Sequence, residues 1–151
     1  MRIFIATCIL LLTTSLTAQT AHHASGSFEP TMKPVSPAGL PDAPTLGRYT
    51  GTKTWHGSVE GTSVVDMLTA STARKDTAGY VAVELVTCKL DGRSGTFELL
   101  HQGTMDEGKQ SLNIAVLKGS GTGALAGITG TLVIHIAADG KHTYDFDYTL
   151  P

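Results

Sequence analysis

Short turn signals divide most of this chain into segments with the spacing of β-strands, and this pattern constrains the fold most strongly. Asp91-Gly92 and Asp139-Gly140 are tight-turn pairs, and residues 106–109 form a further turn. No stretch shows amphipathic helical spacing over three turns. The expected strands are 24–31, 48–57, 59–73, 78–90, 94–105, 110–118, 131–138 and 141–150. Sequential, hairpin-linked strands of this number close into a barrel that has no sheet edges, so we predict an all-β fold, a single antiparallel eight-stranded barrel.

Length and charge limit the number of domains and the kind of partner. The chain has 151 residues, which is the size of one domain. Its formal net charge is -2, with 11 Lys and Arg against 13 Asp and Glu, and it contains no basic run. A nucleic-acid partner therefore has no electrostatic support.

The first 18 residues have the layout of a secretory signal peptide. Arg2 precedes an apolar run from Ile3 to Leu12, and small or polar residues follow as far as Ala18. The run is too short to span a bilayer, which needs about 20 residues. We predict cleavage near Ala18, a secreted or periplasmic protein with no membrane segment after cleavage, and one barrel domain over residues 19–151. Cys88 is then the one cysteine of the mature chain, which excludes an intramolecular disulfide.

Two segments interrupt the strand pattern near the N-terminus that cleavage at Ala18 would create. Residues 19–25 are expected to be a mobile polar lead, which carries His22-His23. Residues 30–46 hold most of the prolines and are expected to be a non-helical excursion that wraps the body or packs over a barrel mouth.

Some strands are apolar on both faces. In the segment 78–90, Tyr80 and Val86 share one side, while Val81, Val83 and Leu85 share the other. An exposed barrel wall should be polar outside, so we expect a homo-oligomer, or the Pro-rich segment, to cover the outer face.

The usual catalytic signatures are absent, and two residues remain as catalytic candidates. His101 shares strand parity with Phe97 and Leu99, which places it on an apolar face, either as an acid or base or as a satisfied core histidine. Glu84 points either inward, as a desolvated carboxylate with a raised pKa, or outward, as a surface charge. No metal site and no cofactor is expected, because the histidines are dispersed.

Aromatic residues supply the other candidates for a site. Tyr144, Phe146 and Tyr148 alternate strictly and should face one side. They either fill the core or line a ligand. The predicted ligand-binding set is Trp55, Tyr80, Phe97, His101, Tyr144, Phe146 and Tyr148.

A series of short motifs carries a family resemblance. They lie at 25–29, 55–57, 60–62, 79–84, 92–97, 101–105, 119–130 and 140–151. In this order and spacing they resemble an uncharacterised bacterial family, domain of unknown function 3224, over residues 24–151. The resemblance implies the allene-oxide-cyclase-like barrel that dirigent proteins also use, and a lumen that takes a hydrophobic small molecule. It brings no established activity.

Three functions remain open at this point. The first is an exported barrel that binds a hydrophobic small molecule in its lumen. The second is a cyclase or isomerase that uses the same pocket, with His101 and Glu84 as its polar groups. The third is a structural oligomer without a ligand.

Overall fold

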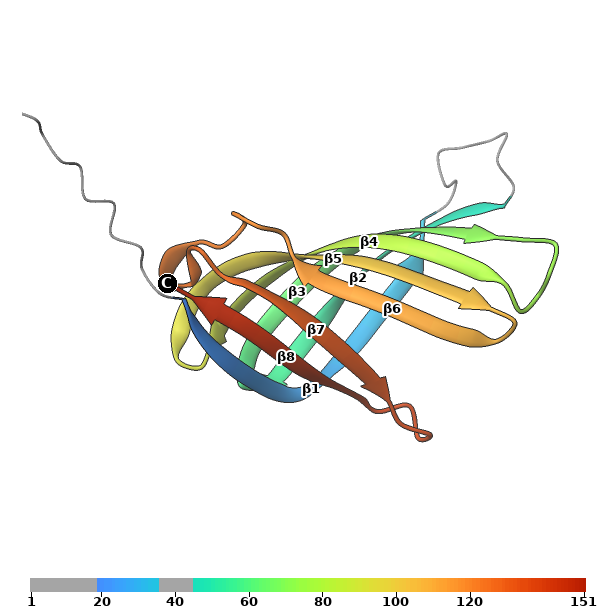
Figure 1. Cartoon of the computed structure of the whole chain (residues 1–151). Helices are drawn as coiled ribbons and strands as arrows, with labels where there is room; N and C mark the ends of the chain where they lie inside the picture. The colour runs from blue at the N-terminus through green and yellow to red at the C-terminus, as the bar shows by residue number, and fades with distance from the viewer. Residues whose placement is uncertain (1–18, 36–44) are drawn as a thin grey trace, which may run out of the picture.

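Eight consecutive strands pair with their neighbours in chain order, and the last pairs with the first to close the barrel (Figure 1). The computed structural model describes residues 19–35 and 45–151. The elements are β1 (Thr20–Pro34), β2 (Leu46–Gly57), β3 (Val59–Ser71), β4 (Ala78–Leu90), β5 (Arg93–Asp106), β6 (Lys109–Val116), the 3-10 turn η1 (Gly123–Leu125), β7 (Thr129–Ile136) and β8 (His142–Leu150). Every adjacent pair is antiparallel. The predicted all-β, eight-stranded barrel is therefore confirmed. The predicted signal peptide lies outside the described residues.

The hairpin turns follow from local backbone chemistry. Asp91 and Gly92 both have positive φ, at 45° and 86°, and so do Glu107 and Gly108, at 50° and 77°. Two successive positive φ values are the signature of the tight turn whose twist matches that of the flanking strands. Both turns were predicted from the sequence.

The first strand differs from the expectation. The lead at 19–25 is not a mobile tail, because β1 begins at Thr20 and pairs with β8 from Thr20↔Leu150 to Phe28↔His142. The last strand of a closing barrel needs a partner, and this segment supplies it.

The predicted Pro-rich excursion also starts too early. β1 runs on through Pro30 and Pro34 and pairs with β2 there. Beyond Phe28 it has a partner on one side only, which is where a strand accommodates residues without an N–H donor. Residues 36–44 of the predicted excursion lie outside the described residues.

Large side chains fill one half of the lumen. The largest fully buried ones are Tyr144, Phe97, Phe146, Leu90, Leu99, Ile114, Leu125, Ile128, Glu84, Val59 and Val86. Leu125 of η1 and Ile128 close this end from the glycine-rich connection between β6 and β7. Gly95 makes this closure possible, because a Cβ there would collide with the carbonyl oxygen of Thr122. We call this part of the barrel the closed half.

The other half is open to solvent. β6 and β7 pair only through Ala115↔Thr131, so their far ends separate (Figure 1). The inward-facing side chains here are only partly buried: Tyr49, Met67, Thr69, Tyr80 and Met105 are intermediate, and Leu112 is exposed. We call this part the open half.

The outer face of the central strands is apolar and exposed in the single chain. Val81 and Val83 of β4 are 54% and 48% exposed, and cross-strand neighbours extend the apolar surface. Its members are Val64, Leu68, Val81, Val83, Leu85 and Leu100. The prediction that these strands are apolar on both faces is confirmed.

Candidate functional site

Glu84 lies in the barrel lumen and is completely buried. It alternates on β4 with Ala82 and Val86, which are also buried, whereas Val83 and Leu85 face outward. The sequence left the direction of Glu84 open, and the structure places it inward. Because a buried carboxylate is strongly unfavourable without partners, its surroundings decide what it can do.

Three neighbouring strands bring polar partners to this carboxylate. Lys53 Nζ on β2 donates to Glu84 Oε2 at 2.6 Å, and Ser63 Oγ on β3 donates to Oε1 at 2.5 Å. Trp55 Nε1 in turn donates to Ser63 Oγ at 3.0 Å. Both carboxylate oxygens are therefore occupied by hydrogen bonds from the barrel wall.

His101 on β5 completes the cluster from the other side. Its Nε2 lies 3.0 Å from Glu84 Oε2, but the approach is too oblique for an aligned hydrogen bond, and Nε2 has no other partner in the described part of the chain. The prediction that His101 lies on the apolar face of its strand is confirmed, and the structure shows that this face lines the lumen. The structure also brings His101 close to Glu84, the other catalytic candidate.

The partners reverse the expected effect of burial on Glu84. Desolvation raises the pKa of this carboxyl, but the nearby His101, the Lys53 ammonium and the Ser63 hydroxyl together outweigh it and lower the pKa. An inward Glu84 was expected to have a raised pKa, and this expectation is wrong. The carboxylate is held ionised.

Lys53 was not among the sequence candidates, although its parity with Trp55 on one strand pointed to the lumen. The residue is only 7% exposed, and Nζ lies 4.8 Å from the centre of the Phe28 ring and 5.2 Å from that of Trp55. An ammonium group that lies above the face of an aromatic ring is attracted by the π electrons of that ring. Lys53, Ser63, Glu84 and His101 form what we call the polar floor, which lies where the closed half meets the open half.

Most of the predicted ligand-binding aromatics pack in the closed half. Trp55 stands edge-on to Tyr144, and Phe146 stacks with Phe97 and with Tyr148. All five belong to the hydrophobic core cluster. The assignment of these five residues to a ligand-binding site stays a prediction.

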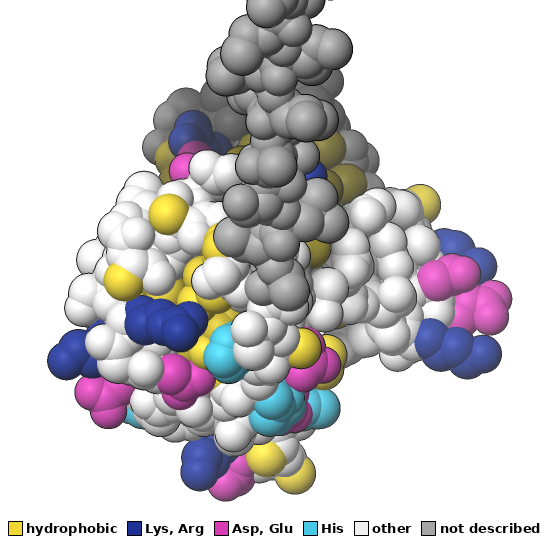
Figure 2. Space-filling view, turned by 60° about the vertical axis from the view of Figure 1, so that its left-hand side comes forward, with side chains coloured by type: hydrophobic (Ala, Val, Ile, Leu, Met, Phe, Trp, Pro, Cys, Tyr) yellow, Lys and Arg dark blue, Asp and Glu magenta, His cyan; other side chains and the backbone are white. Residues whose placement is uncertain are grey.

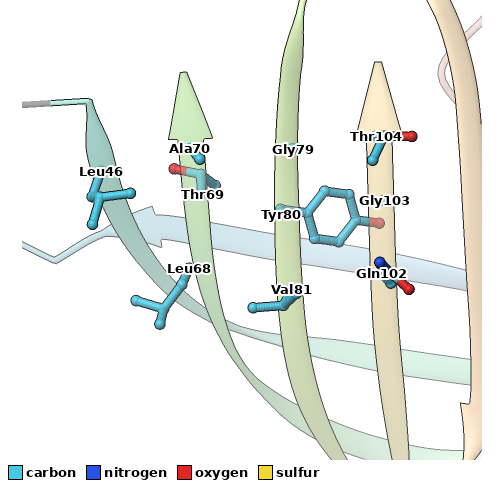
Figure 3. Close-up of a pocket in the computed structure, with 10 residues that line it drawn as sticks. All are labelled: Leu46, Leu68, Thr69, Ala70, Gly79, Tyr80, Val81, Gln102, Gly103 and Thr104. Atoms are coloured by element: carbon cyan, nitrogen blue, oxygen red, sulfur yellow. The ribbon is translucent and has the colours of Figure 1, made fainter. Parts of the chain in front are cut away.

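Tyr80 is the member of that set that lies in the open half. Its ring covers the backbone of Gly103, where a Cβ would collide with it. A pocket of about 330 Å³ lies beside it at the ends of β2 to β5 (Figure 3). The lining residues are Leu46, Leu68, Thr69, Ala70, Gly79, Tyr80, Val81, Gln102, Gly103 and Thr104. Because most of them share the outward parity of Val81, this pocket belongs to the outer rim and does not reach the polar floor.

A second group of titratable residues lies on the outer face of β1, β7 and β8. His23 Nδ1 lies 2.8 Å from Asp147 Oδ1, and His135 Nε2 lies 2.9 Å from Asp145 Oδ2. Histidine and acidic side chains lie side by side on this face (Figure 2). Within residues 19–35 and 45–151, no three or more His, Cys, Asp or Glu side chains are placed to hold a metal ion.

Comparisons with known proteins place the chain in a family. The family model described as "Protein of unknown function (DUF3224)" matches residues 24–148. A crystal structure of a protein with unknown function from the DUF3224 family, from Shewanella oneidensis MR-1, is 38% identical in sequence and superposes with a TM-score of 0.74. That match covers 87% of this chain and 97% of the other. No curated protein matches. The strand order, the barrel and both matches lead to one conclusion: the chain belongs to the DUF3224 family.

Proposed function

We propose that this barrel binds an apolar small molecule in its open half, with the ligand's polar group at the polar floor. The observation that supports this proposal is the fully buried Glu84 with Lys53 and His101, next to inward-facing side chains that are only partly buried. Apolar side chains at these positions would stabilise the folded barrel at least as well, because a buried ion pair is often no more stabilising than a hydrophobic replacement. Stability alone therefore does not explain the ion pair. The closed half supplies the fold's core, which leaves the open half for a ligand.

Two adjacent residues on β4 give a matched test. Ala82 faces the lumen beside the polar floor, and Val83 faces outward. Ala82→Phe should fill the lumen, and Val83→Phe adds the same ring outside. The probe is 1-decanol, and backbone amide shifts are followed by NMR.

In the wild type, decanol should shift lumen-facing residues such as Met67 and Met105. Val83→Phe should keep this response, and Ala82→Phe should lose it. Thr69→Phe is a second lumen variant at a half-buried site, in case Ala82→Phe does not fold. Shifts confined to the outer face, or unchanged by both lumen variants, would overturn the proposal.

Acid–base catalysis in the same lumen is the second candidate function. The observation that favours it is the 3.0 Å separation of His101 Nε2 and Glu84 Oε2, beside the ammonium of Lys53. A cyclase or isomerase that moves a proton between two atoms of one substrate needs a shaped pocket and one or two such groups. Incubation with small unsaturated ketones in D₂O, followed by proton NMR, tests it. Deuterium incorporation should disappear in His101→Ala and in Glu84→Gln, and incorporation that survives both changes would exclude these residues.

We also propose that a second copy of this chain covers the exposed apolar face of β3 to β5. Val64 lies opposite Leu85, Leu68 opposite Val81, and Val83 opposite Leu100, with the exposed Asp66 among them, and exposed apolar clusters of this kind mark interaction sites. Sedimentation of the wild type should show a dimer or larger species. Val83→Lys should shift it to the monomer, and a monomeric wild type would refute this.

Export remains a proposal that rests on the N-terminal sequence. Cleavage near Ala18 predicts an intact mass for the native protein that lacks residues 1–18. A native protein that retains Met1 would contradict it.

A further inference from the structure

We propose that the lumen selects ligands whose polar group is a hydrogen-bond-accepting oxygen, a carbonyl or a carboxylate, and rejects cationic ligands. This inference rests on the proposed function of the lumen and names its ligand class. It follows from which polar atoms of the floor remain free and reachable.

Both carboxylate oxygens of the polar floor already accept a hydrogen bond. Glu84 Oε2 accepts from Lys53 and has His101 Nε2 at 3.0 Å, and Oε1 accepts from Ser63. The carboxylate is also fully buried, so a ligand in the open half does not reach it. A ligand that brings N–H or O–H donors would therefore not reach a carboxylate oxygen.

A donor remains available on Lys53. An ammonium carries three N–H donors, and Glu84 takes one of them. The described residues show no further hydrogen bond from Nζ, whose other neighbours are the faces of Phe28 and Trp55. Because Lys53 retains some exposure and Glu84 has none, a ligand meets the positive member of the pair first. An acceptor oxygen satisfies this donor.

Charge reinforces the selection. Because Glu84 lies behind Lys53, a cationic head group in the open half would lie closer to the ammonium than to the carboxylate, so repulsion by Lys53 would exceed attraction by Glu84. A carbonyl or carboxylate oxygen would take the hydrogen bond instead, and hydrogen bonds to an ionised donor are the stronger kind. The apolar body of the ligand would contact Met67, Tyr80 and Ala82, which face the same lumen. The preferred ligand is thus an apolar molecule with an oxo or carboxylate end.

Three probes with similar alkyl chains test the inference: 2-decanone, decanoate and decylammonium. Calorimetric titration of the wild type should show the ketone and the carboxylate binding at least about tenfold more tightly than decylammonium, a factor that corresponds to 1.4 kcal/mol. The double variant Lys53→Met/Glu84→Gln removes the donor without leaving a lone buried charge. This double variant should bind the three probes with affinities that differ by less than about threefold. The variant Arg48→Met/Asp66→Asn removes an exposed ion pair from the outer face and serves as the control that keeps the preference.

The outcomes separate this inference from the function on which it rests. Equal affinities in the wild type, together with loss of binding in Ala82→Phe, would overturn the head-group selection while lumen binding stands. A preference that persists in Lys53→Met/Glu84→Gln would assign it to another residue and overturn the role of Lys53. Absence of binding for all three probes, or binding that Ala82→Phe does not affect, would overturn both proposals.

Discussion

Lys53 Nζ donates to Glu84 Oε2 at 2.6 Å inside the barrel, across two strands that are not adjacent. β3 lies between them and contributes Ser63 to the same carboxylate. The ion pair therefore ties three strands together at the level where the core ends. Such a pair is expensive to desolvate, and its placement at the base of the open half is why we assign it a function in binding.

The ion pair predicts a strongly non-additive double-mutant cycle. Glu84→Gln leaves the Lys53 ammonium buried without its counter-charge and should lower the free energy of unfolding by about 3–5 kcal/mol. Lys53→Met should do the same by stranding the carboxylate. The double variant should lie within about 2 kcal/mol of the wild type, because no buried charge is left. Urea unfolding gives the free energy of unfolding of the wild type, both single variants and the double variant. If the two single-variant losses simply add in the double variant, the two charges are not coupled.

Acid should weaken the folded state through Glu84. The folded state holds the pKa of this carboxyl below its ordinary value, so the unfolded chain takes up the proton first as pH falls. The contribution of Glu84 is complete above the unfolded pKa of about 4.3 and is lost as pH falls through the folded pKa. Chemical unfolding between neutral and acid pH should thus show a steeper acid loss in the wild type than in Lys53→Met/Glu84→Gln. Parallel curves for the two proteins would contradict this.

Cys88 should be an inert thiol in the folded protein. It lies on the inner face of β4, and burial raises its pKa to about 11. At mildly alkaline pH the thiolate is scarce, so reaction with a disulfide reagent should be about 100-fold slower than in the denatured chain. The measurement uses a chain with Cys8→Ser, so that one thiol is followed. Reaction of the folded protein at the rate of the denatured one would show that β4 opens readily.

Tyr148 should anchor the hairpin between β4 and β5. Its hydroxyl donates to Asp91 Oδ2 at 2.8 Å, and burial together with this bond raises the pKa of Tyr148 to about 12. Tyr148→Phe should lower the free energy of unfolding by about 1–2 kcal/mol and speed amide exchange at Asp91 and Gly92. Tyr49→Phe, at a half-buried tyrosine of the open half, is the matched control. Unchanged exchange at the hairpin in Tyr148→Phe would remove the anchoring role.

Local patterns were sufficient to predict most of the strands and turns. The strand at Ala78–Leu90 was predicted with its observed bounds, because alternation and the Asp91-Gly92 turn are both local signals. The start of β1 at Thr20 was missed, since the pairing of residues 20–23 with β8 joins positions more than 100 residues apart. The position of His101 on the apolar face of its strand was predicted. The direction of Glu84 was left open, because its neighbours on both faces are apolar.

The sequence by itself determined the all-β class, the strand order and the two-sided apolar character of the central strands, because each of these is set by periodicity and by turn residues. Only the tertiary structure decided that Lys53, Ser63, Glu84 and His101 meet at one level of the lumen, because their approach depends on the register of four strands. It also decided the direction of the Glu84 pKa. Desolvation alone would raise that pKa, and the partners that lower it come from strands whose register the sequence does not state.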